Sequence, residues 1–357
     1  MPKSDPPFVS LREHRLPRNS KEVAYVQQLL KEKHERERKI RHADIHAQVE
    51  AARSRTRVPK APGFQQPRIE LAKMKPPRSV VEALQPWKKV LAPSHSALQH
   101  EIKEQQQRLR TMRKHSDKLF GVVGDPTLLD FLDMADSITV TTSPMVDPSG
   151  GSFIFVIPPK PVTSIASFNN LVRFTSTAVS FNGDGGQFAW LDVTMTYTFS
   201  FVSPLAGVCT VIPGFLPNAV FNVTTPASQY VFPFSNTNPH GTMAFTVTAR
   251  ADTFMPGIMP PMMPTETVTG MAFSPPVSLA GVTGFHSVSG GLSGGAHALP
   301  SSVTLSPFLV IPGAKVVISV VYFYENFLTE GGTATLDASS RTTFGFNVPF
   351  ILLKIDY

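Results

Sequence analysis

The chain has 357 residues and a formal net charge of +7, with 33 Lys and Arg residues against 26 Asp and Glu residues. Residues 1–118 hold 27 basic and 13 acidic residues, a net charge of +14, whereas residues 119–357 hold 6 and 13, a net charge of −7. There is no apolar run long enough for a transmembrane helix, no apolar core of a signal peptide at the start, and only one cysteine, Cys209. The sequence therefore excludes an intrachain disulfide framework and predicts synthesis in the cytosol.

The basic part of the chain predicts two helical segments joined by a linker. Residues 20–57 contain no Gly or Pro and place acidic and basic side chains three and four apart, which is typical of a solvated helix. Its apolar residues are sparse, so this helix either stays flexible or folds against another surface. Residues 58–93 form a linker rich in Pro, Lys and Arg, and residues 94–115 predict a second helix with a weak apolar stripe. Together with the residues around them, these segments form a basic N-terminal arm, residues 1–118.

The apolar spacing changes from helical to alternating in residues 119–357. In residues 191–201 every second residue is apolar and the others are Asp, Thr or Ser, which predicts a strand with one buried and one polar face. Residues 243–249 and 344–352 alternate in the same way. Further strand candidates are residues 137–143, 152–157, 171–181, 206–212, 228–233, 267–273, 302–311 and 314–326. This part of the chain therefore predicts a mainly β domain, an antiparallel sandwich or barrel of about eight to ten strands.

The sequence contains one long insertion and two patterns that resemble chemical sites. Both of these patterns have simpler explanations. Residues 253–300 form a Met, Pro and Gly-rich insertion that we expect to make long loops at one end of the β domain. Within it, residues 291–295 match G-x-S-x-G but lack the flanking strand and helix of a nucleophile elbow, which favours a chance match. His42 and His46 stand four apart on the predicted helix, but no third metal ligand accompanies them. We expect a basic, solvated helix there.

A third pattern is a set of carboxylates at the start of the β region. The Asp125-Pro126 pair predicts the beginning of a short helix. Asp130, Asp133 and Asp136 would then lie on one face of this helix or at its end. Three carboxylates could contribute to a calcium site at a subunit contact, since Ca²⁺ prefers several hard oxygen ligands. A solvated helix face is the favoured interpretation.

Clusters of cations in the arm are the strongest functional signal. Such clusters along flexible backbone suit a polyanion, because each phosphate contact releases condensed counterions. The arm has few aromatic residues, which argues against base stacking and sequence-specific readout. An acidic membrane surface and a merely solvated helix are the competing interpretations, and the lack of a large apolar face argues against the membrane. The candidate nucleic-acid-binding residues are Arg36, Arg38, Lys39, Arg41, Arg53, Arg55, Arg57, Lys60, Lys73, Lys75, Arg78, Lys88, Lys89, Arg108, Arg110, Arg113 and Lys114.

A cationic, partly helical arm, a Pro-rich connector and a charge-poor β body together resemble the single jelly-roll capsid proteins of small, non-enveloped icosahedral viruses. The resemblance is greatest to those with positive-strand RNA genomes, and it rests on organisation rather than on a short signature. It implies a jelly-roll shell domain at residues 119–357 that self-assembles, and an arm that packages genomic single-stranded RNA. It also implies a structural role without enzymatic activity or cofactor. The expected partners are the genome, further copies of the chain and a host receptor. The expected locations are the virion and, during assembly, the host cytoplasm.

Two other functions are compatible with parts of the sequence. One is a non-viral nucleic-acid-binding protein with a β-sandwich oligomerisation domain. The other is a cupin-type enzyme, which needs a cluster of His and carboxylate ligands. The β region offers only His240, His286 and His297, all in loop-like sequence, so the enzyme is the less favoured interpretation. The charged fraction of residues 119–357 is about a third of the usual value, which favours a surface that contacts neighbouring subunits.

Overall fold

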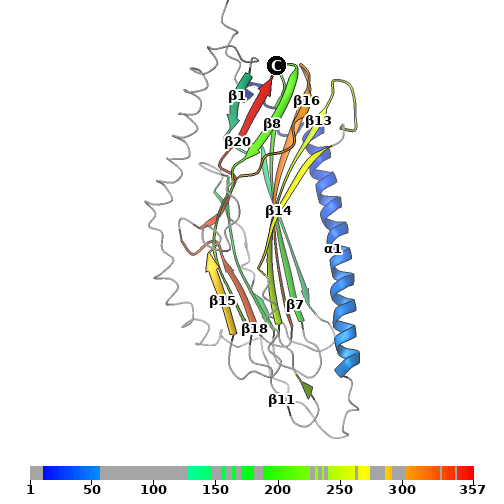
Figure 1. Ribbon diagram of the computed structural model, residues 1–357, viewed down its shortest axis with the longest axis vertical. Coiled ribbons are helices and arrows are strands. Elements are labelled where there is room, and N and C mark those ends of the chain that lie inside the picture. Colours follow the sequence, from blue (N-terminus) through cyan, green and yellow to red (C-terminus); the bar gives the residue numbers. More distant parts are fainter. Residues whose placement is uncertain are drawn as a thin grey trace, which may run out of the picture.

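The structure is a computed structural model that describes part of the chain. The described residues are 11–56, 127–146, 154–156, 163–165, 170–180, 188–225, 230–231, 235–236, 240–261, 264–273, 286–291, 302–329, 332–341 and 344–357. These residues form a short 3-10 turn, a long helix and twenty strands (Figure 1). The predicted linker at residues 58–93 and the predicted helix at residues 94–115 lie outside them, as does the predicted boundary near residue 118.

One long helix, α1 (Lys21–Thr56), follows the 3-10 turn η1 (Leu11–His14). Its range is nearly that of the helix predicted for residues 20–57. Ser20 caps its first turn, because the Ser20 hydroxyl accepts a hydrogen bond of 3.3 Å from the backbone N–H of Val23.

The first layer of the fold is a sheet of five strands in the order β14-β13-β17-β7-β2. All its neighbouring strands pair in antiparallel fashion. Three of its strands are fifteen residues long, so this sheet runs along most of the molecule (Figure 1). Its strands are β2 (Ser137–Val146), β7 (Phe188–Val202), β13 (His240–Phe254), β14 (Thr265–Phe273) and β17 (Lys315–Thr329).

The second layer consists of three shorter antiparallel sheets, with strand orders β1-β20-β8-β16, β4-β5-β19-β9 and β15-β10-β18-β6-β3. The first of them lies at the end that holds the C-terminus, and β15 and β18 lie toward the opposite end (Figure 1). The strands β11 (Tyr230–Val231) and β12 (Ser235–Asn236) form a separate pair. The strands of the three sheets are β1 (Thr127–Leu132), β3 (Ile154–Val156), β4 (Thr163–Ile165), β5 (Leu171–Arg173), β6 (Thr175–Ser180), β8 (Gly207–Pro213), β9 (Leu216–Asn218), β10 (Val220–Thr225), β15 (His286–Gly291), β16 (Phe308–Val310), β18 (Gly332–Asp337), β19 (Gly345–Asn347) and β20 (Ile351–Asp356).

The two layers enclose one apolar core that is rich in aromatic side chains. The inward residues of β7 and β17 include Tyr197 and Tyr322, whose rings contact each other edge to face at 5.8 Å. Both hydroxyls donate to backbone carbonyls of β19: Tyr197 to Phe346 at 2.7 Å and Tyr322 to Asn347 at 2.8 Å. These bonds satisfy two buried polar atoms and join the layers across the core.

The prediction of a mainly β, antiparallel sandwich is confirmed. Successive strands repeatedly change layer, as from β7 to β8, from β16 to β17 and from β17 to β18, which is the behaviour of a jelly-roll chain. The predicted number of strands is too low, because breaks divide several predicted strands into shorter pieces. Residues 344–352, for example, form β19 and the start of β20 rather than one strand, and in residues 302–311 only β16 is a regular strand.

The helix predicted to follow Asp125-Pro126 is wrong for the described residues. The segment from Thr127 onward is the strand β1, which pairs with β20 from Thr127 opposite Asp356 to Leu132 opposite Ile351. The capping signal is local, whereas the pairing partner lies at the other end of the chain. Tertiary pairing therefore outweighs the local preference.

Candidate nucleic-acid interface

Helix α1 lies along the outer face of the five-stranded sheet (Figure 1). Its N-terminal half is held by an apolar cluster that we call the apolar anchor. The anchor combines Leu16 and three helix residues with Phe254 of β13 and Val317 of β17, and Tyr25 contacts Phe254 edge to face at 6.1 Å. The helix residues of the anchor are Val23, Val26 and Leu30. The few apolar residues of the predicted solvated helix therefore have a packing role.

The outer face of β7 is covered by other parts of the chain. The alternation of residues 191–201 predicted one buried and one polar face, but both faces are buried, and Asp192, Thr194 and Ser200 on the polar face are almost fully covered. Part of the predicted N-terminal arm thus packs on the β body. Leu11 of that part even joins the main core.

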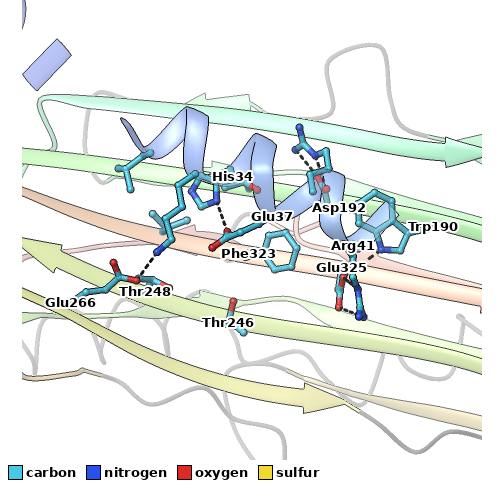
Figure 2. Close-up of a pocket in the computed structure, with 15 residues that line it drawn as sticks. His34, Glu37, Arg41, Trp190, Asp192, Thr246, Thr248, Glu266, Phe323 and Glu325 are labelled. Carbon is cyan, nitrogen blue, oxygen red and sulfur yellow. Dashed lines mark hydrogen bonds and ion pairs between the residues drawn. The ribbon is translucent and has the colours of Figure 1, made fainter. Parts of the chain in front are cut away.

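Beyond the apolar anchor, three ion pairs connect α1 to three different strands, and we call them the ionic ladder. Lys33 Nζ lies 2.7 Å from Glu266 Oε1 of β14. Arg38 donates two hydrogen bonds of 2.8 Å to the carboxylate of Asp192 on β7. Arg41 donates two bonds, of 2.9 and 3.3 Å, to Glu325 on β17. Figure 2 shows Glu266, Asp192, Glu325 and Arg41 beneath and beside the helix.

Two of the acceptors face each other within the sheet. Asp192 and Glu325 are direct partners in the antiparallel register of β7 and β17. Like charges in such positions destabilise a sheet, so the guanidinium groups of α1 offset an unfavourable pair. Trp190 also takes part, because its indole N–H donates to Glu325 at 3.4 Å and its ring contacts His42 edge to face at 4.7 Å.

Burial controls the titration of the groups under the helix. Desolvation raises the pKa of Asp192, against the lowering effect of its hydrogen bonds from Arg38, and the charge of Glu325 raises it further. Desolvation lowers the pKa of His34, although the nearby Glu37 carboxylate, 3.5 Å from His34 Nδ1, opposes this shift. Both shifts arise because the helix excludes water from this part of the sheet.

A cavity of about 410 Å³ lies between the middle of α1 and the sheet (Figure 2). Phe323 and Trp190 line it together with the hydroxyls of Thr194, Thr246 and Thr248. Within the described part of the chain, the buried Thr194 hydroxyl has no hydrogen-bond partner. The floor beneath the ionic ladder is thus partly polar rather than a continuous apolar surface.

The N-terminal residues before α1 bind two of the carboxylates that we considered for calcium. Asp130 is buried and accepts a hydrogen bond of 2.6 Å from the backbone N–H of Leu11. Asp136 is buried, accepts a bond of 2.6 Å from the Ser200 hydroxyl and lies 3.4 Å from Arg15, and desolvation raises its pKa.

The favoured interpretation of these carboxylates, a solvated helix face, is therefore wrong for Asp130 and Asp136, and a calcium site at a subunit contact stays a prediction. Two of them are neither solvated nor on a helix, and within the described ranges no three His, Cys, Asp or Glu residues are placed to hold a metal ion. The reason is that Asp130 and Asp136 serve the packing of the N-terminal residues on the sandwich. Asp133 is exposed.

The structure places six of the predicted nucleic-acid-binding residues on α1. Arg38 and Arg41 bind carboxylates of the sheet, although Arg41 stays partly exposed, whereas Arg36 and Lys39 are exposed and lie outside the ionic ladder. Arg53 and Arg55 lie within the backbone range of α1. The following predicted residues lie outside the described residues: Arg57, Lys60, Lys73, Lys75, Arg78, Lys88, Lys89, Arg108, Arg110, Arg113 and Lys114.

Sequence reasoning missed Lys33 and the three carboxylates of the ionic ladder. A signal was present, because the β body has so few charges that each buried carboxylate must have a partner. Asp192 in particular interrupts a row of Thr and Ser on the polar face of β7. The partner could not be read from the sequence, since α1 is far away along the chain.

The remaining sequence motifs acquire no chemical role in the structure. Gly291 ends β15, and residues 292–295 of the G-x-S-x-G match lie outside the described residues. His42 packs on Trp190, and nothing is described for the side chain of His46. The Met, Pro and Gly-rich insertion contains the strands β14 and β15, and its exposed residues include Ile258 and Met259. No helix among the described residues is long and apolar enough to span a membrane.

Comparison with known proteins yields no family. No protein-family model and no curated protein matches the chain. Among solved structures, TmCBM61 in complex with β-1,4-galactotriose is similar at 11% identity and a TM-score of 0.17, over 62% of this chain and 90% of that one. The Eiger TNF from S. frugiperda is similar at 9% identity and a TM-score of 0.15, over 60% and 92% of the two chains. At these TM-scores the similarities carry no argument about this chain.

Proposed function

We propose that this protein is a viral coat protein that assembles into an icosahedral shell and packages its genome through the basic N-terminal arm. The observation that carries the proposal is the division of charge, +14 in residues 1–118 and −7 in residues 119–357. A chain divided in this way combines a polyanion-binding segment with a body that does not itself attract nucleic acid. The role is structural, and its location is the virion.

The β-sandwich supports the part of the proposal that concerns assembly. It exposes apolar side chains on a short edge strand, where Leu309 of β16 is 69% exposed and stands directly opposite Val208 of β8, itself 38% exposed. The neighbouring Ile311 is 41% exposed. Exposed apolar groups on a strand edge, on a body with few charges, suit contacts with further copies of the chain.

The arm supports the part that concerns the genome. Its cations are numerous, its aromatic residues are few, and phosphate contacts need no particular base sequence. Single-stranded RNA suits a chain of this kind because its flexible backbone can bring phosphates to cations that are spread along the sequence.

Electron microscopy of the purified full chain, with extraction of nuclease-protected nucleic acid, tests the proposal. We expect closed shells that contain protected nucleic acid. Replacing Leu309 by Lys should reduce assembly by placing a charge at the strand edge, whereas Thr304→Lys, at another exposed position just before β16, serves as the matched control. Protein that remains monomeric, or shells without nucleic acid, would contradict the proposal.

A second candidate function would also explain the division of charge between the arm and the body. A non-viral nucleic-acid-binding protein with a β-sandwich oligomerisation domain would also join a basic arm to an uncharged body. The same microscopy separates the two, because that protein would form small oligomers of fixed size and no closed shells.

A further inference from the structure

Opposite charges nearly cancel on the exposed side of α1, in the part of the helix that lies on the sheet. Between residues 31 and 40 it carries three cations and three carboxylates. Glu32 precedes Arg36 by four residues and Glu35 precedes Lys39 by four, a spacing at which opposite charges attract on a helix. The six exposed charged residues are Lys31, Glu32, Glu35, Arg36, Glu37 and Lys39. The docked helix therefore offers little to a polyanion on this side.

Three further cations of the helix bind the sheet on the opposite side. Lys33, Arg38 and Arg41 all face the sheet, and each binds a sheet carboxylate in the ionic ladder. Two of them belong to the predicted nucleic-acid-binding residues. A phosphate group and a carboxylate are recognised by the same paired N–H groups of a guanidinium.

We propose that Lys33, Arg38 and Arg41 are the phosphate-binding side of α1, and that the sheet carboxylates hold them until single-stranded nucleic acid competes for them. The inference rests on the proposed function and adds a form of control, in which the body occupies three cations of the arm in the absence of a genome. Glu266, Asp192 and Glu325 stand in for three phosphates.

The packing of α1 allows such an exchange without loss of the helix from the body. The apolar anchor holds the chain from Leu16 to Leu30, and the ionic ladder begins only at Lys33. Residues 33–42 can therefore lift while the anchor stays in place. The pairs of Lys33 and Arg41 are partly exposed, and such ion pairs are weak and sensitive to salt, whereas a polyanion that binds all three cations gains from counterion release. The Thr hydroxyls beneath the ladder can be hydrated once the helix lifts.

Trp190 provides a direct readout of this step. The chain has two tryptophans, so Trp87→Phe leaves Trp190 as the only indole, in contact with His42 and Glu325. The experiment adds a labelled uridine 30-mer to the full-length Trp87→Phe protein and follows its anisotropy together with Trp190 emission. We expect the RNA to bind, Trp190 emission to shift to longer wavelength, and amide exchange to accelerate in residues 33–42 but not in residues 23–30.

A matched pair of variants tests the competition itself. Asp192→Asn and Asp356→Asn each remove one negative charge, but only Asp192 binds α1, whereas Asp356 pairs with Lys354 on β20. We expect Asp192→Asn to bind the uridine 30-mer about fivefold more tightly, and Asp356→Asn to bind as the parent does. Glu266→Gln, at a more exposed position of the ladder, is the second variant if the first does not fold.

The outcomes separate the inference from the proposed function. RNA binding without a change in Trp190 emission, in exchange of residues 33–42 or in the affinity of the variants overturns the inference and leaves the proposed function intact. Absence of RNA binding overturns both.

Discussion

Asp192 and Glu325 lie directly opposite each other on β7 and β17, and each receives a guanidinium group from α1. The donors, Arg38 and Arg41, are three residues apart, which places them on one side of the helix. Two carboxylates that would repel each other within a sheet are thus balanced by two cations of a distant segment. This relationship makes α1 part of the sandwich and ties the charge of the arm to the charge of the body.

Removing one of these cations should destabilise the native protein. Arg38→Ala leaves Asp192 buried, charged and without its bidentate partner, and we expect the free energy of unfolding at pH 7 to fall by about 2 kcal/mol. Desolvation already raises the pKa of Asp192, and the loss of Arg38 raises it further. A group whose native pKa is raised regains stability as the pH falls through that value, so the deficit should shrink toward pH 4.

Urea unfolding at a series of pH values measures this effect. Arg36→Ala is the matched control, because Arg36 is exposed on the same helix, and its unfolding free energy should stay within about 0.5 kcal/mol of the parent. An equal loss in both variants, or a deficit that does not change with pH, would show that the Asp192 pair is not responsible.

His34 predicts a pH dependence of the opposite sign. Burial lowers its pKa below the ordinary value of 6.5, so the native protein resists a proton that the unfolded chain accepts. Its contribution to stability is therefore present above pH 6.5 and is lost as the pH falls toward the native pKa. We expect His34→Gln to lose less stability than the parent between pH 7.5 and pH 5.5, as measured by urea unfolding. A parallel pH profile in the two proteins would be inconsistent with a buried, neutral imidazole.

The apolar anchor should contribute clearly to the free energy of unfolding, although it contains few residues. Leu30 is 3% exposed in the anchor, whereas Ile40 is 59% exposed on the same helix. We expect Leu30→Ala to cost about 2 kcal/mol and Ile40→Ala almost nothing, since only the first removes buried apolar contacts. Amide exchange of residues 23–30 should accelerate only in Leu30→Ala. If both variants behave alike, the helix is not held by the anchor.

Cys209 should be inert in the native protein. It is the only cysteine, it is buried on β8, and desolvation raises its pKa to about 12. The thiolate is the reactive form, so we expect almost no reaction with a thiol reagent at pH 8 until the protein unfolds. The rate of modification across a urea titration should then follow the unfolding transition. Rapid modification of the folded protein would mean that β8 is open to solvent.

The fold was predictable from the sequence to the extent that local patterns decide it. The absence of Gly and Pro in residues 20–57 predicted α1, and alternation predicted the long strands β7, β13 and β17. The strand β1 was not predictable, because its pairing with β20 outweighs the local signal of Asp125-Pro126. Local patterns carry no information about such distant partners.

The candidate site shows the same limit. The sequence indicates that Arg38 and Arg41 are cations on a helix, but it does not indicate that Asp192 and Glu325 receive them. The polar face of β7 looked solvated for the same reason, since periodicity shows which residues share a face and not what covers it. A basic arm and an acidic body can bind each other within one chain, and each can also bind a separate partner.

The amount of nuclease-protected nucleic acid per assembled subunit tests the central claim most directly. If the arm neutralises the genome, each cation offsets about one phosphate, so replacing four arm cations by Gln should lower the protected length by about four nucleotides per subunit. The four are Arg53, Arg55, Arg57 and Lys60, and the matched control replaces Glu70, Glu82, Glu101 and Glu104 by Gln, which should raise that length by a similar amount. Protected lengths that are equal in the parent and both variants would contradict packaging through the arm.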